Sequence, residues 1–381
     1  MSFQVNGDRL REARRFRHFT MSALADAVGV SSQMISRYER NDARPSLEIF
    51  QKIIQTLKFP ISFFTLVDSF KYQDDGTFYR SRLTAIQSEK QASEIYKKAA
   101  GVVRDYFGEY IDFPRLDIDV QKGDTPRLAA QALREAWGLG DSPISNMVRL
   151  LEKHGVVVVF INSGSQRVDA NSGYVSVNDH PYYIVLVDTI SQSFYRLQFS
   201  LAHELGHLLL HADVLDPQEL DAQEYRRMES EADEFASEFL LPAAKFRESL
   251  GTEKMSTDKY LSLKVTWHVA MSAMVYRARS LDILSANEYL KLQKRISYHK
   301  WRKVEPLDKK TPIPRPEVLH QSFDLLTKEG ILDPSSLSSS LGRKYGVPYP
   351  NEILSQVIDV NPDQFSGEIV QLKSGSSYSN G

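Results

Sequence analysis

Two histidines and a glutamate form the part of the sequence whose residue types and spacing could do chemistry. His203 and His207 stand four residues apart, and Glu204 directly follows the first. On an α-helix, residues four apart lie on one face about 6 Å apart along the axis, so both imidazoles could bind one metal ion. The intervening glutamate would then face the open coordination position of a zinc hydrolase site. The alternative, a buried helix with incidental polar residues, would leave three polar groups in a core without partners.

The two histidines need a third ligand from elsewhere in the chain, because a catalytic zinc typically takes three protein ligands and one water. The chain has no cysteine, so this ligand must be His, Asp or Glu. His211 is eight residues from His203, about 12 Å along a helix axis, and is expected to cap the helix end or to support another ligand. Asp213 would need a sharp return of the chain and is the less favourable alternative.

A second helix pattern supplies a better candidate for this ligand. It carries an apolar stripe at helical spacing and ends before Pro242. Glu229 lies about 50° from the centre of the stripe and Glu231 about 110° from it. We therefore predict that Glu229 is the third zinc ligand and that Glu231 faces solvent. Asp233, one turn after Glu229, is predicted to hydrogen-bond a metal-bound histidine. Solvent-facing positions are also predicted for two further acids, Glu234 and Glu238.

This set of residues predicts hydrolysis of a peptide bond. Zinc would lower the pKa of a bound water towards 7, and Glu204 would take its proton as hydroxide attacks a peptide carbonyl. Glu204 would then return the proton to the leaving amine. A further donor would stabilise the oxyanion, but no residue is marked for this role by its spacing.

The composition limits the cellular compartment and the kind of nucleic-acid binding that we expect. The 381 residues are 42% hydrophobic and 25% charged, which is enough chain for two or three domains. The net charge of −2 argues against a chain that coats nucleic acid indiscriminately, so DNA binding must come from a local surface. The absence of cysteine fits a reducing compartment. The start of the chain lacks a leader pattern and no apolar run is long enough to span a membrane, so we expect a cytoplasmic protein without membrane contact.

The secondary-structure pattern predicts an α+β protein with an all-α N-terminal domain. Residues 1–65 contain short helix patterns separated by turn residues, at 8–17, 21–28, 32–40 and 46–57, the last of them capped by a serine. Two more helices are expected at 127–137 and 144–154, the latter capped by Ser142. Strand patterns rich in β-branched and aromatic residues occur at 156–161, 173–177 and 182–187, directly before the histidine helix.

The N-terminal helices resemble a known DNA-binding family. Residues 20–31, followed by 35–39 and the pair Pro45-Ser46, are similar to the phage-repressor (Cro/XRE-like) helix-turn-helix domain. In a helix-turn-helix pair the second helix enters the major groove of DNA. The resemblance also implies that Arg14 and Glu39 pair inside the fold. Met21 departs from the family pattern, which usually has a glutamine that touches the DNA backbone at this position.

Polar residues of the third helix are the candidates for contact with double-stranded DNA. Glutamine and arginine can form bidentate hydrogen bonds with adenine and guanine, and other arginines bind phosphates. The alternative is that these side chains only solvate an exposed helix face. The candidates for base contact are Ser32, Gln33, Ser36 and Arg37, and those for phosphate contact are Arg40 and Arg44. Because such domains usually bind two half-sites, a homodimer is expected.

The two metal-site segments together resemble a peptidase family. The segment 199–211 and the later segments Glu229-x-x-Ala232 and 235–242 are similar to the ImmA/IrrE metallopeptidases, over roughly residues 75–300. This resemblance implies a zincin-like core, a bound Zn²⁺ and a repressor-type protein as substrate. Cleavage of the repressor would release the genes that it silences.

The predicted domains follow from these patterns. They are a helix-turn-helix domain over 1–65, a helical connector over 66–122, a zincin-like metallopeptidase domain over 123–302, a proline-rich linker over 303–316, a small mostly helical region over 317–373 and a disordered tail over 374–381. Within the third unit, apolar residues at helical spacing between 265 and 302 indicate a core-packing helix rather than a second DNA-binding element. A strand end is expected at Ile369-Val370.

Two other functions remain open from the sequence. One is a DNA-binding regulator whose zincin-like domain senses or scaffolds and cleaves nothing. The other is an antitoxin-like autorepressor that holds a partner toxin. The intact Glu204 argues against the first of these, because a purely structural metal site has no use for a general base.

Overall fold

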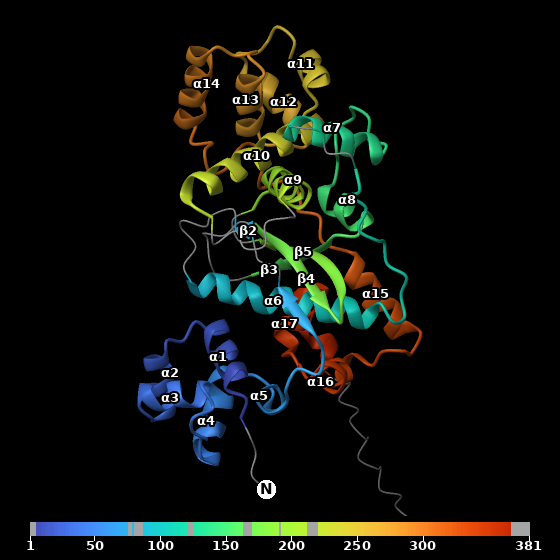
Figure 1. The fold of residues 1–381 in the computed structure, drawn as a ribbon. Coiled ribbons are helices and arrows are strands. Elements are labelled where there is room, and N and C mark those ends of the chain that lie inside the picture. Colours follow the sequence, from blue (N-terminus) through green and yellow to red (C-terminus); the bar gives the residue numbers. More distant parts are fainter. Residues whose placement is uncertain are drawn as a thin grey trace, which may run out of the picture.

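A small β-sheet lies in the middle of the molecule, with helices stacked above and below it (Figure 1). The computed structural model describes residues 5–74, 78–79, 87–120, 123, 125–162, 170–189, 192–211 and 220–366. Within these ranges, no helix combines the length and the apolar character needed to cross a membrane. The predicted α+β class, with an N-terminal helical domain before the sheet, is confirmed.

Short helices form the N-terminal domain as the sequence predicts. Four of them begin at a residue whose side chain accepts a hydrogen bond from the first turn, namely Asn6, Thr20, Ser31 and Ser46. The predicted pair of Arg14 and Glu39 is confirmed, with the Arg14 Nε 2.5 Å from the Glu39 Oε1. A fifth helix was not predicted. The helices are α1 (Gly7–Phe16), α2 (Met21–Val28), α3 (Ser32–Glu39), α4 (Leu47–Leu57) and α5 (Ile61–Thr65).

The sheet is mixed and draws on more of the chain than the sequence indicates. Its strands in the described ranges are β1 (Tyr72–Asp74), β2 (Phe78–Tyr79), β3 (Val157–Ile161), β4 (Ala170–Val177) and β5 (His180–Asp188). The order across the sheet is β1-β4-β5-β3, and β2 pairs with the same edge of β4 as β1. β4 and β5 form an antiparallel hairpin, whereas β3 runs parallel to β5. The three predicted strands are confirmed, and β1 and β2 add strands from the segment expected to be a helical connector.

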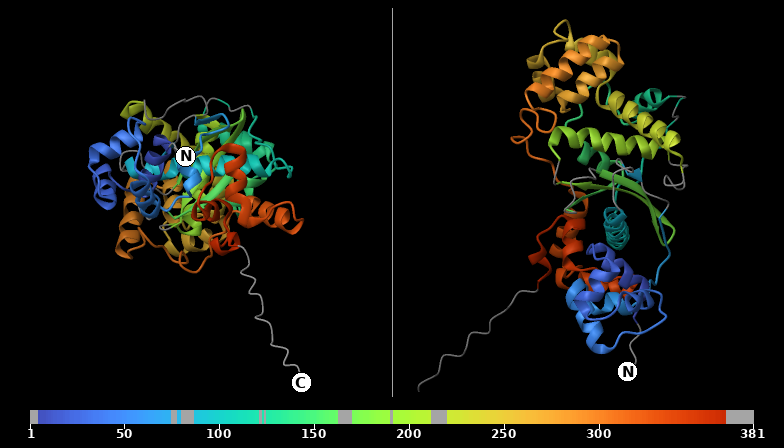
Figure 2. Two further views of the ribbon diagram at one scale, coloured as in Figure 1. Left: turned by 90° about the horizontal axis from the view of Figure 1, so that it is seen from below. Right: turned by 90° about the vertical axis from the view of Figure 1, so that its left-hand side faces the viewer.

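Each face of the sheet packs on one long helix. Alternate residues of β3 belong to two different cores, because successive side chains of a strand point to opposite faces. Val157 and Val159 pack with α6 (Gln87–Phe107), and Val158 and Phe160 pack on the side of α9 (Phe194–Leu210). The right-hand view in Figure 2 shows α6 end-on between the sheet and the N-terminal domain. The sheet therefore separates the side of the N-terminal domain from the side of the histidine helix.

Further helices surround α9, and two of the predictions for them were wrong. The helix expected at 144–154 begins at Met147 and is capped by Asn146, not by Ser142, whose carbonyl accepts a hydrogen bond from Arg134. The single helix expected between 265 and 302 is divided among three helices, because the chain turns at His268 and again after Leu281. The helices on this side are α7 (Pro126–Ala136), α8 (Met147–Lys153), α10 (Ala222–Leu240), α11 (Ala243–Leu250), α12 (Thr257–Trp267), α13 (Met271–Ser280) and α14 (Ala286–Tyr298).

The C-terminal helices return to the N-terminal domain and share its core. They are α15 (Val318–Lys328), α16 (Leu337–Tyr345) and α17 (Asn351–Ile358), with short 3-10 turns η1 (Pro334–Ser336) and η2 (Pro362–Phe365). Tyr349 is fully buried, and its ring centroid lies 6.4 Å from that of Phe63. Arg17 forms an ion pair of 2.8 Å with Glu352. The expected strand end at 369–370 and the expected disordered tail at 374–381 lie outside the described residues.

Candidate metal centre and DNA-binding surface

The helix α9 carries the two histidines and is buried on nearly all sides. Its sequence is apolar around most of its circumference, and a helix of this kind belongs in a core. Gly206, between the histidines, lets α10 approach closely. A Cβ atom built on Gly206 would lie 3.2 Å from the backbone of Ala232 and 3.1 Å from the Phe235 ring. Because Gly206 has no side chain, α10 can lie close enough to α9 for its acidic residues to reach the histidines.

The helix α10 is fixed at its start and presents its acids to α9. Asp221 caps it, and the Glu224 side chain bonds back to the Asp221 backbone N–H, which forms a capping box. Glu229 follows about two turns after the cap. The capping box and the contact at Gly206 set both the start and the position of α10, so the direction of the Glu229 side chain follows from the helical period.

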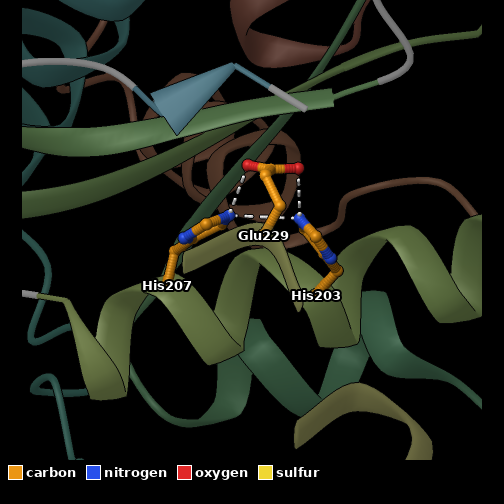
Figure 3. A group of neighbouring side chains, drawn as sticks. All are labelled: His203, His207 and Glu229. Carbon is orange, nitrogen blue, oxygen red and sulfur yellow. Dashed lines mark hydrogen bonds and ion pairs between the residues drawn. The ribbon is translucent and has the colours of Figure 1, made fainter. Parts of the chain in front are cut away.

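His203, His207 and Glu229 converge in the structure (Figure 3). The Nε2 atoms of the two histidines are 3.1 Å apart. The Glu229 carboxylate lies 3.5 Å from the His203 Nε2 and 3.3 Å from the His207 Nε2. One ligand atom from each of the three residues lies within 4.8 Å of the other two. The structure thus brings together the three residues that the sequence predicts as zinc ligands.

The outer nitrogens of both histidines also have partners. The His203 Nδ1 lies 2.8 Å from the Asp233 Oδ1, in the position predicted for a residue that orients a metal-bound histidine. The His207 Nδ1 lies 3.0 Å from the Nδ1 of His211. His211 is also the C-cap residue of α9, so it occupies both of the positions that the sequence allowed. Asp213, the alternative ligand, lies outside the described residues.

Two acids of α10 were predicted to face solvent, but the structure places them against other side chains. Glu231 accepts a hydrogen bond of 3.0 Å from the His211 Nε2, and its side chain is only 35% exposed. Glu238 is 1% exposed and contacts Arg277 and, at 2.8 Å, the Gln131 side chain. Both predictions were wrong because α10 is contacted by other helices as well as along its apolar stripe. Glu234 is exposed as predicted.

Glu204 points from α9 towards β4. It is fully buried, and its carboxylate accepts a hydrogen bond from the Ser172 hydroxyl. The Tyr183 hydroxyl lies 2.7 Å from that same serine oxygen. Sequence reasoning did not single out Ser172 or Tyr183, because a contact between a strand and a helix that follows later in the chain leaves no periodic pattern. Their hydrogen bonds hold the Glu204 side chain in one orientation.

Burial and neighbouring groups set the charges at the site. Burial lowers the pKa of His207 to about 4, against the opposing effect of Glu229. His207 is therefore neutral at pH 7 and can offer a lone pair. Burial would raise the pKa of Glu229, but its interactions with His203 and His207 outweigh burial and lower that pKa to about 2. Glu229 is therefore ionised over the whole physiological range.

The donor set fits a zinc ion. If the two Nδ1 nitrogens donate to their partners, both Nε2 atoms carry lone pairs that point at each other and at a carboxylate. Three converging acceptors repel one another unless a proton or a metal cation lies between them. Nitrogen and oxygen ligands at about 2.0–2.1 Å from a tetrahedral zinc are roughly 3.4 Å apart. The separations of 3.1, 3.3 and 3.5 Å are close to this value.

The candidate DNA-contacting residues lie on an accessible part of the N-terminal domain. Ser32, Gln33 and Arg37 are exposed on α3, and Ser36 is half-buried. Figure 1 shows α3 on the side of this domain away from α16 and α17. Of the candidate phosphate contacts, Arg44 and Arg40 are both exposed, and Arg40 forms an ion pair of 2.9 Å with Asp42. DNA would have to compete with Asp42 for Arg40.

Two segments of the chain match known protein families. Residues 151–279 match the IrrE N-terminal-like domain of peptidase family M78. Residues 10–64 match the helix-turn-helix family. Over 110 residues, 29% of this chain, the sequence is 28% identical to the HTH-type transcriptional regulator SinR of Bacillus licheniformis, and the match covers 91% of that protein.

The fold, the site and these matches define a helix-turn-helix regulator domain joined to a metallopeptidase-type domain. The first domain is similar to helix-turn-helix domains of the Cro/XRE type, and the second is similar to the IrrE N-terminal-like domains of peptidase family M78. The resemblances predicted from the sequence, in the order found along the chain, are confirmed.

Proposed function

We propose that this protein is a DNA-associated, zinc-dependent endopeptidase that cleaves a transcriptional repressor or regulator. The observation that carries this proposal is the convergence of His203, His207 and Glu229, with the buried Glu204 directly after His203 on the same helix. Cleavage would relieve repression of the genes that the substrate silences, such as stress or mobile-element genes.

The proposed chemistry assigns one task to each group. His203, His207 and Glu229 hold the metal, and Asp233 orients His203. Zinc bound there would lower the pKa of a water molecule and polarise the peptide carbonyl. Glu204 takes the proton from the attacking water and returns it to the leaving amine. Ser172 keeps the Glu204 carboxylate oriented for both transfers.

The N-terminal domain supports the proposed choice of substrate. The helix-turn-helix match and the similarity to SinR support binding to double-stranded DNA. A peptidase held on DNA meets DNA-bound proteins at a raised local concentration, without any new contact to the substrate. A homodimer on two half-sites is part of the proposal, since domains of this type usually bind in pairs.

A glutamine at position 204 tests the proposed reaction. Glu204→Gln keeps the size of the side chain but cannot accept the proton, so we expect full zinc binding and a loss of proteolysis of at least about 100-fold. Proteins from cells that express the wild type and from cells that express Glu204→Gln are compared by mass spectrometry. A regulator fragment made only with the wild type supports the proposal. Identical protein patterns under inducing stresses contradict it.

Replacement of Arg37 tests the DNA-binding part of the proposal. A bidentate base contact contributes about 1–3 kcal/mol, so Arg37→Ala should weaken binding to a selected DNA site by about 5- to 150-fold. The site is first selected from random DNA with the wild-type protein, and zinc content is measured in parallel and should not change. Arg149→Ala, at a surface position of α8, is the charge-matched control. Unaltered affinity of Arg37→Ala would remove this residue from the base-contacting set.

A regulator that cleaves nothing is the second candidate function. It is favoured by one observation, the continuous core that the helix-turn-helix domain shares with α6, one face of the sheet and the C-terminal helices. Such a core suits a domain that transmits a ligand signal to DNA. The same comparison of wild type and Glu204→Gln separates the two, because this function predicts no fragment and an unchanged phenotype for Glu204→Gln.

A further inference from the structure

The two histidines of the proposed metal centre are supported in different ways. His203 contacts a carboxylate directly, through the 2.8 Å contact between its Nδ1 and Asp233. On its Nδ1 side, His207 contacts a second imidazole instead of a carboxylate. Its Nδ1 lies 3.0 Å from the His211 Nδ1, and the His211 Nε2 lies 3.0 Å from the Glu231 Oε2. Neither His211 nor Glu231 is part of the proposed ligand set.

We infer that Glu231 and His211 form a hydrogen-bond relay that fixes the tautomer and ring orientation of His207 for metal binding. This inference rests on the proposed metal centre and deepens it. His211 and Glu231 are positioning residues, because they act on the metal only through His207. The sequence pattern predicts that Glu231 faces solvent, so the relay can be seen only in the tertiary structure.

The proton positions along the relay follow from the chemistry of each group. An ionised carboxylate only accepts hydrogen bonds, so the His211 Nε2 must carry the proton that Glu231 accepts. A neutral His211 then has a lone pair on Nδ1, which can accept only from an N–H. The His207 Nδ1 must supply that N–H, and this leaves the lone pair of His207 on Nε2. The Nε2 atom is the one that faces His203 and Glu229.

Because the relay is buried, the positions of its protons decide whether His207 can bind a metal. His207 and His211 are 1% and 6% exposed, so water does not readily supply alternative partners. Without Glu231, His211 could carry its proton on Nδ1, where it would meet the N–H of His207. His207 would then rotate or place its proton on Nε2, where it blocks the metal. Groups that orient a metal ligand typically change metal affinity by about 10- to 100-fold when they are removed.

The geometry also explains why the relay needs both helices. His211 lies four residues after His207 and so shares its face of α9. Glu231 comes from α10 and is itself held by Arg227, whose Nε lies 3.4 Å from the other carboxylate oxygen. The close contact of α10 at Gly206 brings Glu231 within reach of the end of α9.

Zinc affinity of the full-length protein tests the relay without any substrate. Zinc dissociation constants are measured by competition with a chromophoric chelator. His211→Phe keeps a ring but removes both hydrogen bonds, and we expect a 10- to 100-fold weaker affinity. His211→Gln can accept from His207 and donate to Glu231, so it should retain most of the wild-type affinity. Glu229→Ala, which removes a ligand, sets the scale for a lost metal site.

Glu231→Ala has a matched control on the same helix. Glu234→Ala removes the same charge from an exposed position, so the difference between the two variants measures the relay rather than the general charge near the zinc. We expect Glu231→Ala to weaken zinc binding at least about tenfold more than Glu234→Ala, the lower end of the range for such groups. The double variant His211→Phe/Glu231→Ala should be no weaker than His211→Phe alone, because both changes break one relay.

Two further results complete the test. The visible spectrum of the cobalt-substituted protein should change in His211→Phe and keep the wild-type form in Glu234→Ala, since only the first disturbs His207. Melting of the metal-free variants shows whether the fold is retained. The relay alone would be overturned if His211→Phe and Glu231→Ala both kept tight zinc binding. It would also be overturned if the effects of the two variants on zinc affinity simply added. Absence of zinc binding in the wild type would overturn the metal centre and the relay together.

Discussion

His207 shows how burial prepares a residue for metal binding before any metal is present. An imidazole in water is half-protonated near pH 6.5, whereas burial lowers the pKa of His207 to about 4. The same effect makes the fold sensitive to acid. The unfolded chain takes up a proton between pH 6.5 and pH 4 and the folded chain does not, so the free energy of unfolding rises with pH over this interval.

We therefore expect the metal-free protein to lose stability as the pH falls from 6.5 towards 4. A pKa difference of this size corresponds to roughly 3 kcal/mol for His207. Urea unfolding in the presence of a chelator, at pH 7 and pH 4.5, measures the change. His207→Gln, which does not titrate, should show a smaller dependence on pH. Equal pH dependence in the two proteins would mean that His207 does not resist protonation.

Gly206 and the contact between α9 and α10 determine whether the three proposed ligands meet. In an isolated helix, Gly206→Ala would be stabilising by about 1 kcal/mol. Here the added Cβ would meet the backbone of Ala232, which cannot yield without a shift of α10. Since α10 carries Glu229, such a shift moves this carboxylate away from the histidines.

We expect Gly206→Ala to cost about 1–3 kcal/mol of stability and to weaken zinc binding at least about tenfold. Gly101→Ala is the matched control, because Gly101 is a helical glycine of α6 whose Cβ would lie 2.9 Å from Val175, on the other face of the sheet. The control should lose stability and keep its zinc affinity. Chemical denaturation and chelator competition measure the two quantities. Wild-type zinc affinity in Gly206→Ala would show that α10 can adjust without moving Glu229.

The whole molecule is organised so that its two ends share one core. The N-terminal domain packs on α6 and on the C-terminal helices, with Phe63 against Tyr349 and Arg17 paired with Glu352. Ser69 adds a backbone hydrogen bond of 3.0 Å to Tyr345. The C-terminal region, for which the sequence offers no motif, thus joins the helix-turn-helix domain to the sheet.

Tyr349→Ala should therefore destabilise the helix-turn-helix domain although it lies almost 300 residues away in the sequence. Loss of a fully buried aromatic side chain costs about 3–5 kcal/mol. Hydrogen exchange should show reduced protection in α1 and α5 together with α16 and α17. Tyr298→Ala, at a side chain that is 84% exposed, is the control. Loss of protection confined to the C-terminal helices would mean that the two ends fold independently.

The sequence by itself determined the features that depend on neighbours along the chain. Helical spacing put His203 and His207 on one face, and the apolar stripe of α10 distinguished Glu229 from Glu231 as the residue nearer to them. The capping residue Ser46 marked the start of α4, and β-branched runs marked β3, β4 and β5. These features are local because hydrogen bonds of a helix or the alternation of a strand link residues only a few positions apart.

Only the tertiary structure decided which groups contact the side chains of a helix outside its apolar stripe. The angle of Glu231 or Glu238 from one apolar stripe cannot show that His211 or Arg277 approaches from another helix. The pairing of β1 and β2 with β4 and the return of the C-terminal helices to the N-terminal domain likewise join segments far apart in the chain. Such contacts depend on the packing of the whole core, because the surface that buries one segment is supplied by other segments of the chain.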